Sequence, residues 1–274
     1  MRVALCISGH LRNYLEPLRS QLNLLIKKYV NIDVFISTWT DFGFKNGPKT
    51  TITDRDLITI KNLLNPKVLD LEEYTDSYFK QEAEYIIKTK KSPTNYRWGK
   101  KAGIVSMFYK IYRCNLFKTE YEQKNNFTYD LVIRSRPDLL LTKVPELHPT
   151  PNTIIIYDQG GPANYHIGDL FFAGPSQIIN RLSNIYRDLP ETYNKINSLF
   201  DPHDILEKSI DYYKISKQFI IINYSLMNIQ ILDIIEPKPK NRLITQRKEK
   251  IITKPSKVID KKPIINLRVL KKKH

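Results

Sequence analysis

The middle of the chain contains two apolar runs separated by a short charged segment. Residues 129–141 have the sequence YDLVIRSRPDLLL. The run LVI predicts a buried strand, and LLL predicts a second apolar segment. Between them lie Arg134, Arg136 and Asp138. Ligands of open α/β sheets bind beyond the carboxyl ends of strands, so we expect a binding site at this segment.

The amino-terminal part of the chain predicts a strand, a helix and a second strand. Residues 2–8 (RVALCIS) form a short apolar run that ends at Ser8 and Gly9. Leucine and isoleucine recur at helical spacing in residues 15–29, and residues 32–39 (IDVFISTW) form another buried run. This order makes a parallel strand pair with a right-handed crossover the default arrangement.

The rest of the chain continues the alternation of helices and strands. We expect helices at residues 54–64, with Thr53 as N-cap, and at 100–121, 177–186 and 204–212. We expect strands at 67–71, 153–157, 170–173 and 218–224, whereas residues 72–97 show no interpretable period. The prediction is an α/β fold with a mixed, mostly parallel sheet flanked by helices, in one domain spanning residues 1–236. Cys6 and Cys114 fall in apolar elements, which predicts two reduced, buried thiols.

The positive charge of the chain is concentrated at its carboxyl end. The formal net charge is +16, but residues 237–274 hold 14 Lys and Arg against 2 acidic residues. The first 236 residues are nearly balanced, with 30 basic and 26 acidic side chains. We expect residues 237–274 to be an extended or disordered tail that binds an anionic membrane surface, a nucleic acid or an acidic partner, or that only aids solubility.

Several protein classes are disfavoured by what the sequence lacks. No run approaches the roughly 18 apolar residues of a membrane helix. The short apolar run at the start predicts a first strand rather than a signal peptide. We therefore expect a cytoplasmic protein. No glycine-rich phosphate loop, nucleophile elbow or Cys/His zinc spacing is present.

The charged segment of residues 134–138 has two chemical interpretations. Guanidinium forks match phosphate oxygens, and a neighbouring carboxylate can hold a divalent cation that bridges phosphates. Alternatively, Arg134 or Arg136 forms an internal salt bridge with Asp138. Spacing alone leaves both interpretations open.

Four motifs in this order resemble a group of glycosyltransferase-like proteins of the GT-A fold. They are CISGHLRN, SMFYKIYRCN, YDLVIRSRPDLLL and HIGDLFFAGP. The group occurs in bacterial surface-polysaccharide clusters and large DNA viruses, and the resemblance covers roughly residues 2–230. GT-A enzymes bind a divalent cation through a D-x-D motif. Here Asp138 matches its second acid, and Arg136 stands in place of the first.

The resemblance implies a role for each matching residue. Ser8, Gly9 and Arg12 would meet the nucleotide, and Lys110, Arg134 and Arg136 would bind its diphosphate. Asp138 and His203 would ligate manganese or magnesium, with His166 as an alternative ligand. Asp169 and Asp204 are the candidates for sugar binding or for the base that activates an acceptor hydroxyl.

The resulting prediction is a glycosyltransferase that uses a nucleotide-sugar donor and a glycan or other hydroxyl acceptor. It would act in the cytoplasm, or in the host cytoplasm if the source is viral, at the membrane periphery if the tail binds lipid. Because the first acid of the motif is missing, a non-catalytic nucleotide- or sugar-binding relative is the alternative. A basic nucleic-acid-associated protein is a third class, which the near-neutral body disfavours.

Overall fold

The computed structural model describes residues 1–43, 50–89, 101–157, 167–220 and 222–226. The predicted boundary at residue 236, the basic tail and His166 lie outside these residues. Among them, no helix is both long enough and apolar enough to cross a membrane.

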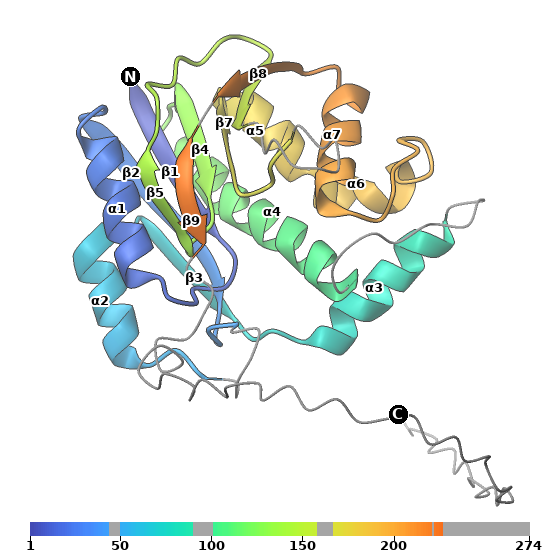
Figure 1. Cartoon of the computed structure of the whole chain (residues 1–274), viewed down its shortest axis with the longest axis horizontal. Coiled ribbons are helices and arrows are strands. Elements are labelled where there is room, and N and C mark those ends of the chain that lie inside the picture. The colour runs from blue at the N-terminus through green and yellow to red at the C-terminus, as the bar shows by residue number, and fades with distance from the viewer. Residues whose placement is uncertain (44–49, 90–100, 158–166, 221, 227–274) are drawn as a thin grey trace, which may run out of the picture. The chain divides into compact units, whose positions relative to one another are not determined.

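A seven-stranded sheet forms the centre of the described part (Figure 1). Its strand order is β3-β2-β1-β4-β7-β6-β8. The strands are β1 (Arg2–Ser8), β2 (Asn31–Trp39), β3 (Val68–Glu72), β4 (Leu131–Ser135), β6 (Thr153–Tyr157), β7 (Phe171–Gly174) and β8 (Ser216–Ile220). Only β7 runs antiparallel to its neighbours, β4 and β6, and the other pairings are parallel. The predicted α/β fold with a mixed, mostly parallel sheet is confirmed.

Helices cover both faces of the sheet (Figure 1). They are α1 (Leu15–Ile26), α2 (Asp54–Leu64), α3 (Asp76–Lys88), α4 (Lys101–Lys124), α5 (Ser176–Ser183), α6 (Ile185–Thr192) and α7 (Pro202–Tyr212). A second sheet pairs β5 (Leu139–Lys143) with β9 (Asn223–Leu226). Strand β5 packs against α1.

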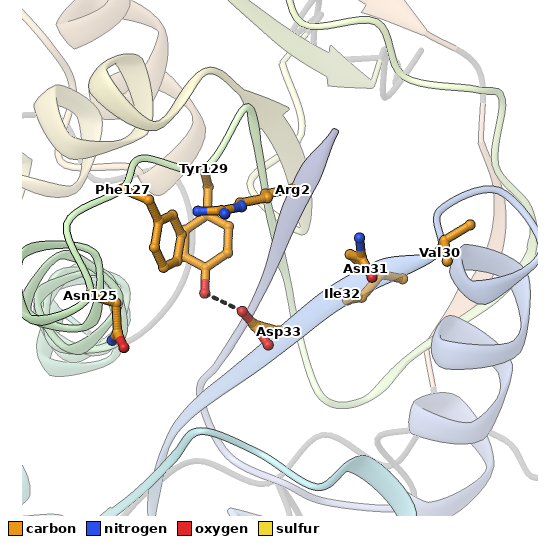
Figure 2. Close-up of a pocket in the computed structure, with 8 residues that line it drawn as sticks. All are labelled: Arg2, Val30, Asn31, Ile32, Asp33, Asn125, Phe127 and Tyr129. Carbon is orange, nitrogen blue, oxygen red and sulfur yellow. Dashed lines mark hydrogen bonds between the residues drawn. The ribbon is translucent and has the colours of Figure 1, made fainter.

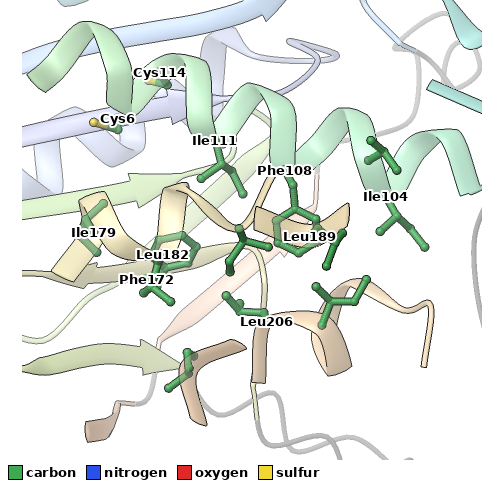
Figure 3. Packing of buried hydrophobic residues seen from close by; sticks show 14 of the residues in the cluster. Cys6, Ile104, Phe108, Ile111, Cys114, Phe172, Ile179, Leu182, Leu189 and Leu206 are labelled. Atoms are coloured by element: carbon green, nitrogen blue, oxygen red, sulfur yellow. The ribbon is translucent and has the colours of Figure 1, made fainter. Parts of the chain in front are cut away.

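The two faces of β1 show why a strand with polar residues only at its ends lies at the centre of the sheet. Ala4 and Cys6 belong to the apolar cluster on the side of α4, α5 and α7 (Figure 3). Val3, Leu5 and Ile7 belong to the cluster on the side of α1 and α2. Side chains alternate between the faces of a strand, so a continuous apolar run fills two cores at once. Cys6 and Cys114 are both buried free thiols, as predicted.

Several predicted boundaries needed correction. The predicted helix at 177–186 is two helices, which meet at Asn184. The helix expected from residue 204 begins at Pro202, because the Asp201 carboxylate caps its amino end. The strand expected at 218–224 is β8 followed by the separate β9, which pairs with β5 in the second sheet. Thr53 does cap α2, in a capping box with Asp56.

Candidate functional site

The segment between β4 and β5 holds a two-pronged ion pair. Arg136 Nε donates to Asp138 Oδ1 at 2.9 Å, and Arg136 Nη2 donates to Asp138 Oδ2 at 2.7 Å. The Asp138 side chain is fully buried, whereas 21% of the Arg136 side chain is exposed. This is the internal salt bridge that the sequence left as an alternative for residues 134–138.

A second guanidinium reaches the same carboxylate from the loop after β1. Arg12 Nη1 donates to Asp138 Oδ2, and Arg12 Nε donates to the Gly43 carbonyl at 3.2 Å. Arg12 has a φ of +47°, in the left-handed region, and its backbone N–H donates to the Phe42 carbonyl at 2.9 Å. The strained backbone and these bonds fix the direction of the Arg12 side chain.

The charges around Asp138 determine its protonation. Burial alone would raise the pKa of the Asp138 carboxyl, but the attraction of Arg136 and Arg12 outweighs it and holds that pKa below its ordinary value. Burial lowers the pKa of Arg12, although the pairing with Asp138 opposes this shift. Asp138 is therefore an ionised carboxylate whose two oxygens both accept guanidinium hydrogen bonds.

These contacts do not suit Asp138 to a divalent cation. A metal would have to displace the hydrogen bonds to both oxygens, and it would meet two guanidinium charges at close range. In the part of the chain that the structure describes, no group of three His, Cys, Asp or Glu side chains could hold a metal ion. The expected manganese or magnesium site at Asp138 and His203 stays a prediction that these contacts do not support.

A third guanidinium, that of Arg134 in β4, is buried near the same edge of the sheet. Strands β1 and β4 are parallel neighbours with Cys6 opposite Arg134, so both strands end at the same edge of the sheet. Arg134 is buried, its Nε donates to Ser8 Oγ at 3.2 Å, and its Nη1 donates to the Asp169 carbonyl. Burial lowers the pKa of Arg134 to about 10, so the side chain stays charged at neutral pH.

The reversed direction of β7 brings Asp169 to this edge. Because β7 is antiparallel to β4, the residues that precede β7 lie beside the carboxyl end of β4, and Arg136 N donates to the Leu170 carbonyl at 3.2 Å. Asp169 is 6% exposed. The preceding residue, Gly168, leaves no room for a side chain, since a Cβ there would lie 1.9 Å from the Tyr157 ring.

The predicted metal ligand His203 lies beside the predicted catalytic residue Asp169, whereas the predicted catalytic residue Asp204 does not. His203, in the first turn of α7, lies with Nδ1 3.7 Å from Asp169 Oδ1. Asp204 has a different environment, because its Oδ2 accepts hydrogen bonds from Ser198 Oγ and from the Leu199 backbone N–H. The structure thus brings His203 to Asp169, while Asp204 fastens the turn that precedes α7.

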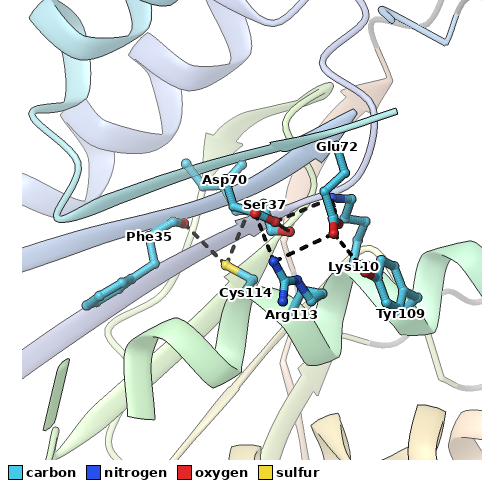
Figure 4. Close-up of polar contacts among 9 residues, drawn as sticks. Phe35, Ser37, Asp70, Glu72, Tyr109, Lys110, Arg113 and Cys114 are labelled. Atoms are coloured by element: carbon cyan, nitrogen blue, oxygen red, sulfur yellow. Dashed lines mark hydrogen bonds and ion pairs between the residues drawn. The ribbon is translucent and has the colours of Figure 1, made fainter. Parts of the chain in front are cut away.

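Lys110, which the sequence predicts to bind phosphate, is paired instead with carboxylates of the protein itself (Figure 4). Its ammonium is fully buried, 2.6 Å from Glu72 Oε2 and 3.4 Å from Asp70 Oδ2. It also lies 4.2 Å from the centre of the Trp39 ring. Burial lowers the pKa of Lys110, and the two carboxylates oppose that shift. These contacts tie α4 to β3 and leave the ammonium no exposed surface.

His10 is a residue of this edge that the sequence reasoning did not single out. Its Nδ1 lies 3.4 Å from Asp41 Oδ1, and its ring centre lies 5.9 Å from Trp39 and 5.3 Å from Tyr74. Burial lowers the pKa of His10, with Asp41 opposing the shift. The sequence feature that could have identified His10 as a site residue is its position between Gly9 and Arg12 in the run CISGHLRN.

A pocket of about 520 Å³ lies at the opposite, amino-terminal edge of β1 and β2 (Figure 2). Its lining includes Arg2, Asp33 and Phe127, and the Arg2 guanidinium lies 4.5 Å from the centre of the Phe127 ring. None of the predicted site residues lines this pocket. We place the candidate site at the carboxyl edge, because the charged side chains converge there.

Comparisons with known proteins find similarity in structure alone. No protein-family model matches the chain, and no curated protein matches its sequence. The apo crystal structure of mouse xyloside xylosyltransferase 1 is 9% identical with a TM-score of 0.41, over 80% of this chain and 84% of that one. The apo form of the glycosyltransferase GlyE of Streptococcus pneumoniae TIGR4 is 9% identical with a TM-score of 0.38, over 79% of this chain and 44% of that one. Similarity of this degree does not assign the chain to a family.

Proposed function

We propose that the protein is a glycosyltransferase that moves a sugar from a nucleotide-sugar donor to a hydroxyl group of a glycan. The observation that carries this proposal is the convergence of Arg12, Arg134 and Arg136 on one edge of the sheet. That edge lies between β1 and β4, where the strand order reverses and where α/β sheets collect their ligands. The resemblance of the four sequence motifs to GT-A glycosyltransferases supports the same activity.

The arginines suit a diphosphate leaving group. A guanidinium has five N–H donors, and Asp138 and Gly43 engage only some of those on Arg12 and Arg136. Both side chains are partly exposed, at 15% and 21%, so their remaining donors can reach a ligand. Asp138 then acts as a positioning residue that aims two guanidinium groups. Preorganised charges of this kind stabilise negative charge that develops in a transition state.

The transfer step can be assigned to these residues. The bond between the anomeric carbon and the diphosphate oxygen breaks, and its electron pair leaves with the diphosphate toward the arginines. The acceptor oxygen forms the new bond to the anomeric carbon, and its proton passes to the Asp169–His203 pair. We propose that the nucleotide approaches the backbone at Ser8 and Gly9, where β1 ends.

Thermal-shift and hydrolysis measurements test this function. UDP-glucose, UDP-xylose, UDP-N-acetylglucosamine and GDP-mannose are each added with manganese and, separately, with a chelator. A donor at 100 times its Kd stabilises the protein by about 2.7 kcal/mol. We expect one donor to stabilise the protein and to be hydrolysed in chelator, with strong loss of both effects in Arg136→Ala and none in Arg55→Ala, an exposed control on α2. Activity that strictly requires manganese would contradict this expectation and support transfer assisted by a divalent cation.

A non-catalytic nucleotide-sugar-binding protein is the second candidate, because an arginine stands where the D-x-D motif has its first acid. It predicts stabilisation by a donor without hydrolysis or transfer. For residues 237–274 we propose binding to anionic lipid headgroups, and for the protein a cytoplasmic location at the membrane periphery.

A further inference from the structure

The pocket at the amino-terminal edge of the sheet contains none of the candidate-site residues. Its volume of about 520 Å³ lies within the range of small-molecule sites. Three segments of the chain build it: the start of β1, the start of β2 with the residue before it, and the loop after α4. The side chains that line this pocket are drawn in Figure 2.

The Arg2 guanidinium in this pocket is oriented without use of its hydrogen-bond donors. It lies 4.5 Å from the centre of the Phe127 ring. The Arg2 backbone N–H donates to Asp130 Oδ2 at 2.7 Å, which holds the backbone from which the side chain extends. In the described part of the chain, no hydrogen bond or ion pair engages this guanidinium. A planar guanidinium that stacks on a ring presents its N–H groups at its edge, so its donors remain available to a ligand.

Asp33 supplies an acceptor whose charge is already balanced. Its Oδ2 accepts a hydrogen bond from the Tyr129 hydroxyl at 2.7 Å, and its Oδ1 lies 3.2 Å from Lys67 Nζ. Burial and the Asp33 carboxylate raise the pKa of the Tyr129 hydroxyl, which therefore remains a donor at neutral pH. The Asp33 side chain is 29% exposed, and a carboxylate has about four lone-pair positions. Asp33 can therefore also accept hydrogen bonds from ligand hydroxyl groups.

Two amide side chains add donors to those of Arg2. Asn31 is exposed and lies opposite Arg2 in the parallel pairing of β1 with β2. Residues two apart in a strand share a face of the sheet, so Arg2, Asn31 and Asp33 face the same side. Asn125 Nδ2 donates to the Tyr121 carbonyl at 2.8 Å and keeps its second N–H. These donors exceed what two carboxylate oxygens need, and they suit the three terminal oxygens of a phosphate monoester.

We propose that this pocket is a second binding site of the protein and takes a phosphorylated polyol, either a free sugar phosphate or the headgroup of a phosphoinositide. The phosphate lies against Arg2 and the two amides, and hydroxyl groups of the ligand donate to Asp33. Val30 lines the pocket and is 97% exposed, so a lipid-borne ligand would bring this side chain against the bilayer. The site does not depend on the proposed glycosyltransferase function.

Calorimetry with small ligands tests the phosphate site. Glucose 6-phosphate and myo-inositol 4-phosphate are titrated into the full chain, beside glucose and glucuronate, which lack the phosphate. A phosphorylated ligand should bind the wild type, and Arg2→Ala should weaken that binding about tenfold. Arg2→Lys keeps the charge but not the planar fork, so we expect an intermediate loss. Arg55→Ala removes an exposed positive charge of α2 that does not line the pocket, and it should bind like the wild type.

Vesicle binding separates the free ligand from the lipid-borne one. Vesicles of phosphatidylcholine, with and without phosphatidylinositol 4-phosphate, are sedimented with the wild type, Arg2→Ala and Arg55→Ala. Binding of the free sugar phosphate that Arg2→Ala weakens supports the site with a soluble ligand. Binding of the lipid headgroup alone, weakened in Arg2→Ala and not in Arg55→Ala, supports it with a membrane ligand. An equal reduction of vesicle binding in both variants, without binding of a free phosphate, reflects net charge and overturns the proposal.

Three further results would overturn the pocket as a phosphate site. They are no binding of any phosphorylated ligand, free or lipid-borne, equal binding by the wild type and Arg2→Ala, and equal affinity for glucose 6-phosphate and glucuronate. Donor hydrolysis is measured in the same samples, and Arg2→Ala should leave it unchanged. Its absence from the wild type contradicts the proposed function by itself. Melting temperatures of the variants exclude misfolding as the cause of lost binding.

Discussion

Replacing Asp138 with asparagine removes the negative charge that Arg12 and Arg136 share. The side chain is fully buried, and both of its oxygens accept hydrogen bonds from these guanidinium groups. In Asp138→Asn the two positive charges remain close together with no carboxylate between them. Breaking a buried ion pair in this way costs about 3–5 kcal/mol. In a domain of this size, each kcal/mol shifts the melting temperature by about 2–4 °C.

The expected result is a melting temperature roughly 6–20 °C below that of the wild type at neutral pH, measured by circular dichroism. The matched control is Asp130→Asn, since Asp130 is an exposed carboxylate that accepts a hydrogen bond from the Arg2 backbone N–H at the other end of β4. We expect that control to melt close to the wild type. A loss of activity in Asp138→Asn with an unchanged melting temperature would refute the salt-bridge reasoning and favour metal ligation.

The same ion pairs give the wild type a pH dependence of fixed sign. The pKa of Asp138 is lower in the folded protein than in the unfolded chain. The stabilisation by this carboxylate is therefore complete above the unfolded pKa and is lost as the pH falls through the folded pKa. Urea unfolding from pH 7 to pH 3 should show a flatter acid limb in Asp138→Asn than in the wild type. Parallel curves would contradict this assignment.

Four further changes have defined outcomes. Arg12→Ala should weaken binding of UDP more than binding of uridine, by about 1.5–3 kcal/mol, in paired calorimetric titrations, because its proposed partner is phosphate. Lys110→Ala should lower the free energy of unfolding by about 1–3 kcal/mol in urea titrations, since Asp70 and Glu72 lose their buried cation and keep only their pairing with Arg113. Gly168→Ala should destabilise the protein in the same assay by about 1–3 kcal/mol, because its Cβ meets the Tyr157 ring. Deleting residues from 237 onward should leave the melting temperature unchanged and reduce binding to phosphatidylserine vesicles at low salt, whereas a truncated chain that no longer folds would show that the tail packs on the body.

The central strands were predictable because their pattern is simple. Residues 2–8 and 32–39 are mostly apolar runs on either side of a helical period, and they form β1 and β2 with Cys6 paired to Phe35. The parallel direction followed from the long connection between them. The direction of β7 did not follow, since the run LFFA is apolar at every position and says nothing about its neighbours.

Helix α3 was missed for a related reason. Its buried residues are Phe79, Ala83 and Ile86, and exposed tyrosines and charged residues surround them. Two exposed aromatic residues, Tyr78 and Tyr85, blur the difference between the buried and exposed faces of this helix. An apolar period is readable only where the solvent face is polar.

The candidate site was predictable in place but not in its contacts. The end of β4 identified Arg134, Arg136 and Asp138, and Arg136 does pair with Asp138 over two residues. The contact of Arg12 with Asp138 joins residues 126 positions apart. It depends on the adjacency of β1 and β4 and on the left-handed backbone of Arg12, and a single sequence shows neither.

Because β7 pairs antiparallel with β4, the position of Asp169 relative to the end of β4 depends on the register between these two strands. Ser135 lies opposite Phe171, and this alignment sets how far Asp169 extends past the end of β4. A slip of two residues would preserve the apolar faces of both strands, yet it would move Asp169 by about 7 Å relative to Arg134. A change in the length of β7 that leaves the core intact would therefore separate Asp169 from Arg134 without a substitution in the candidate site.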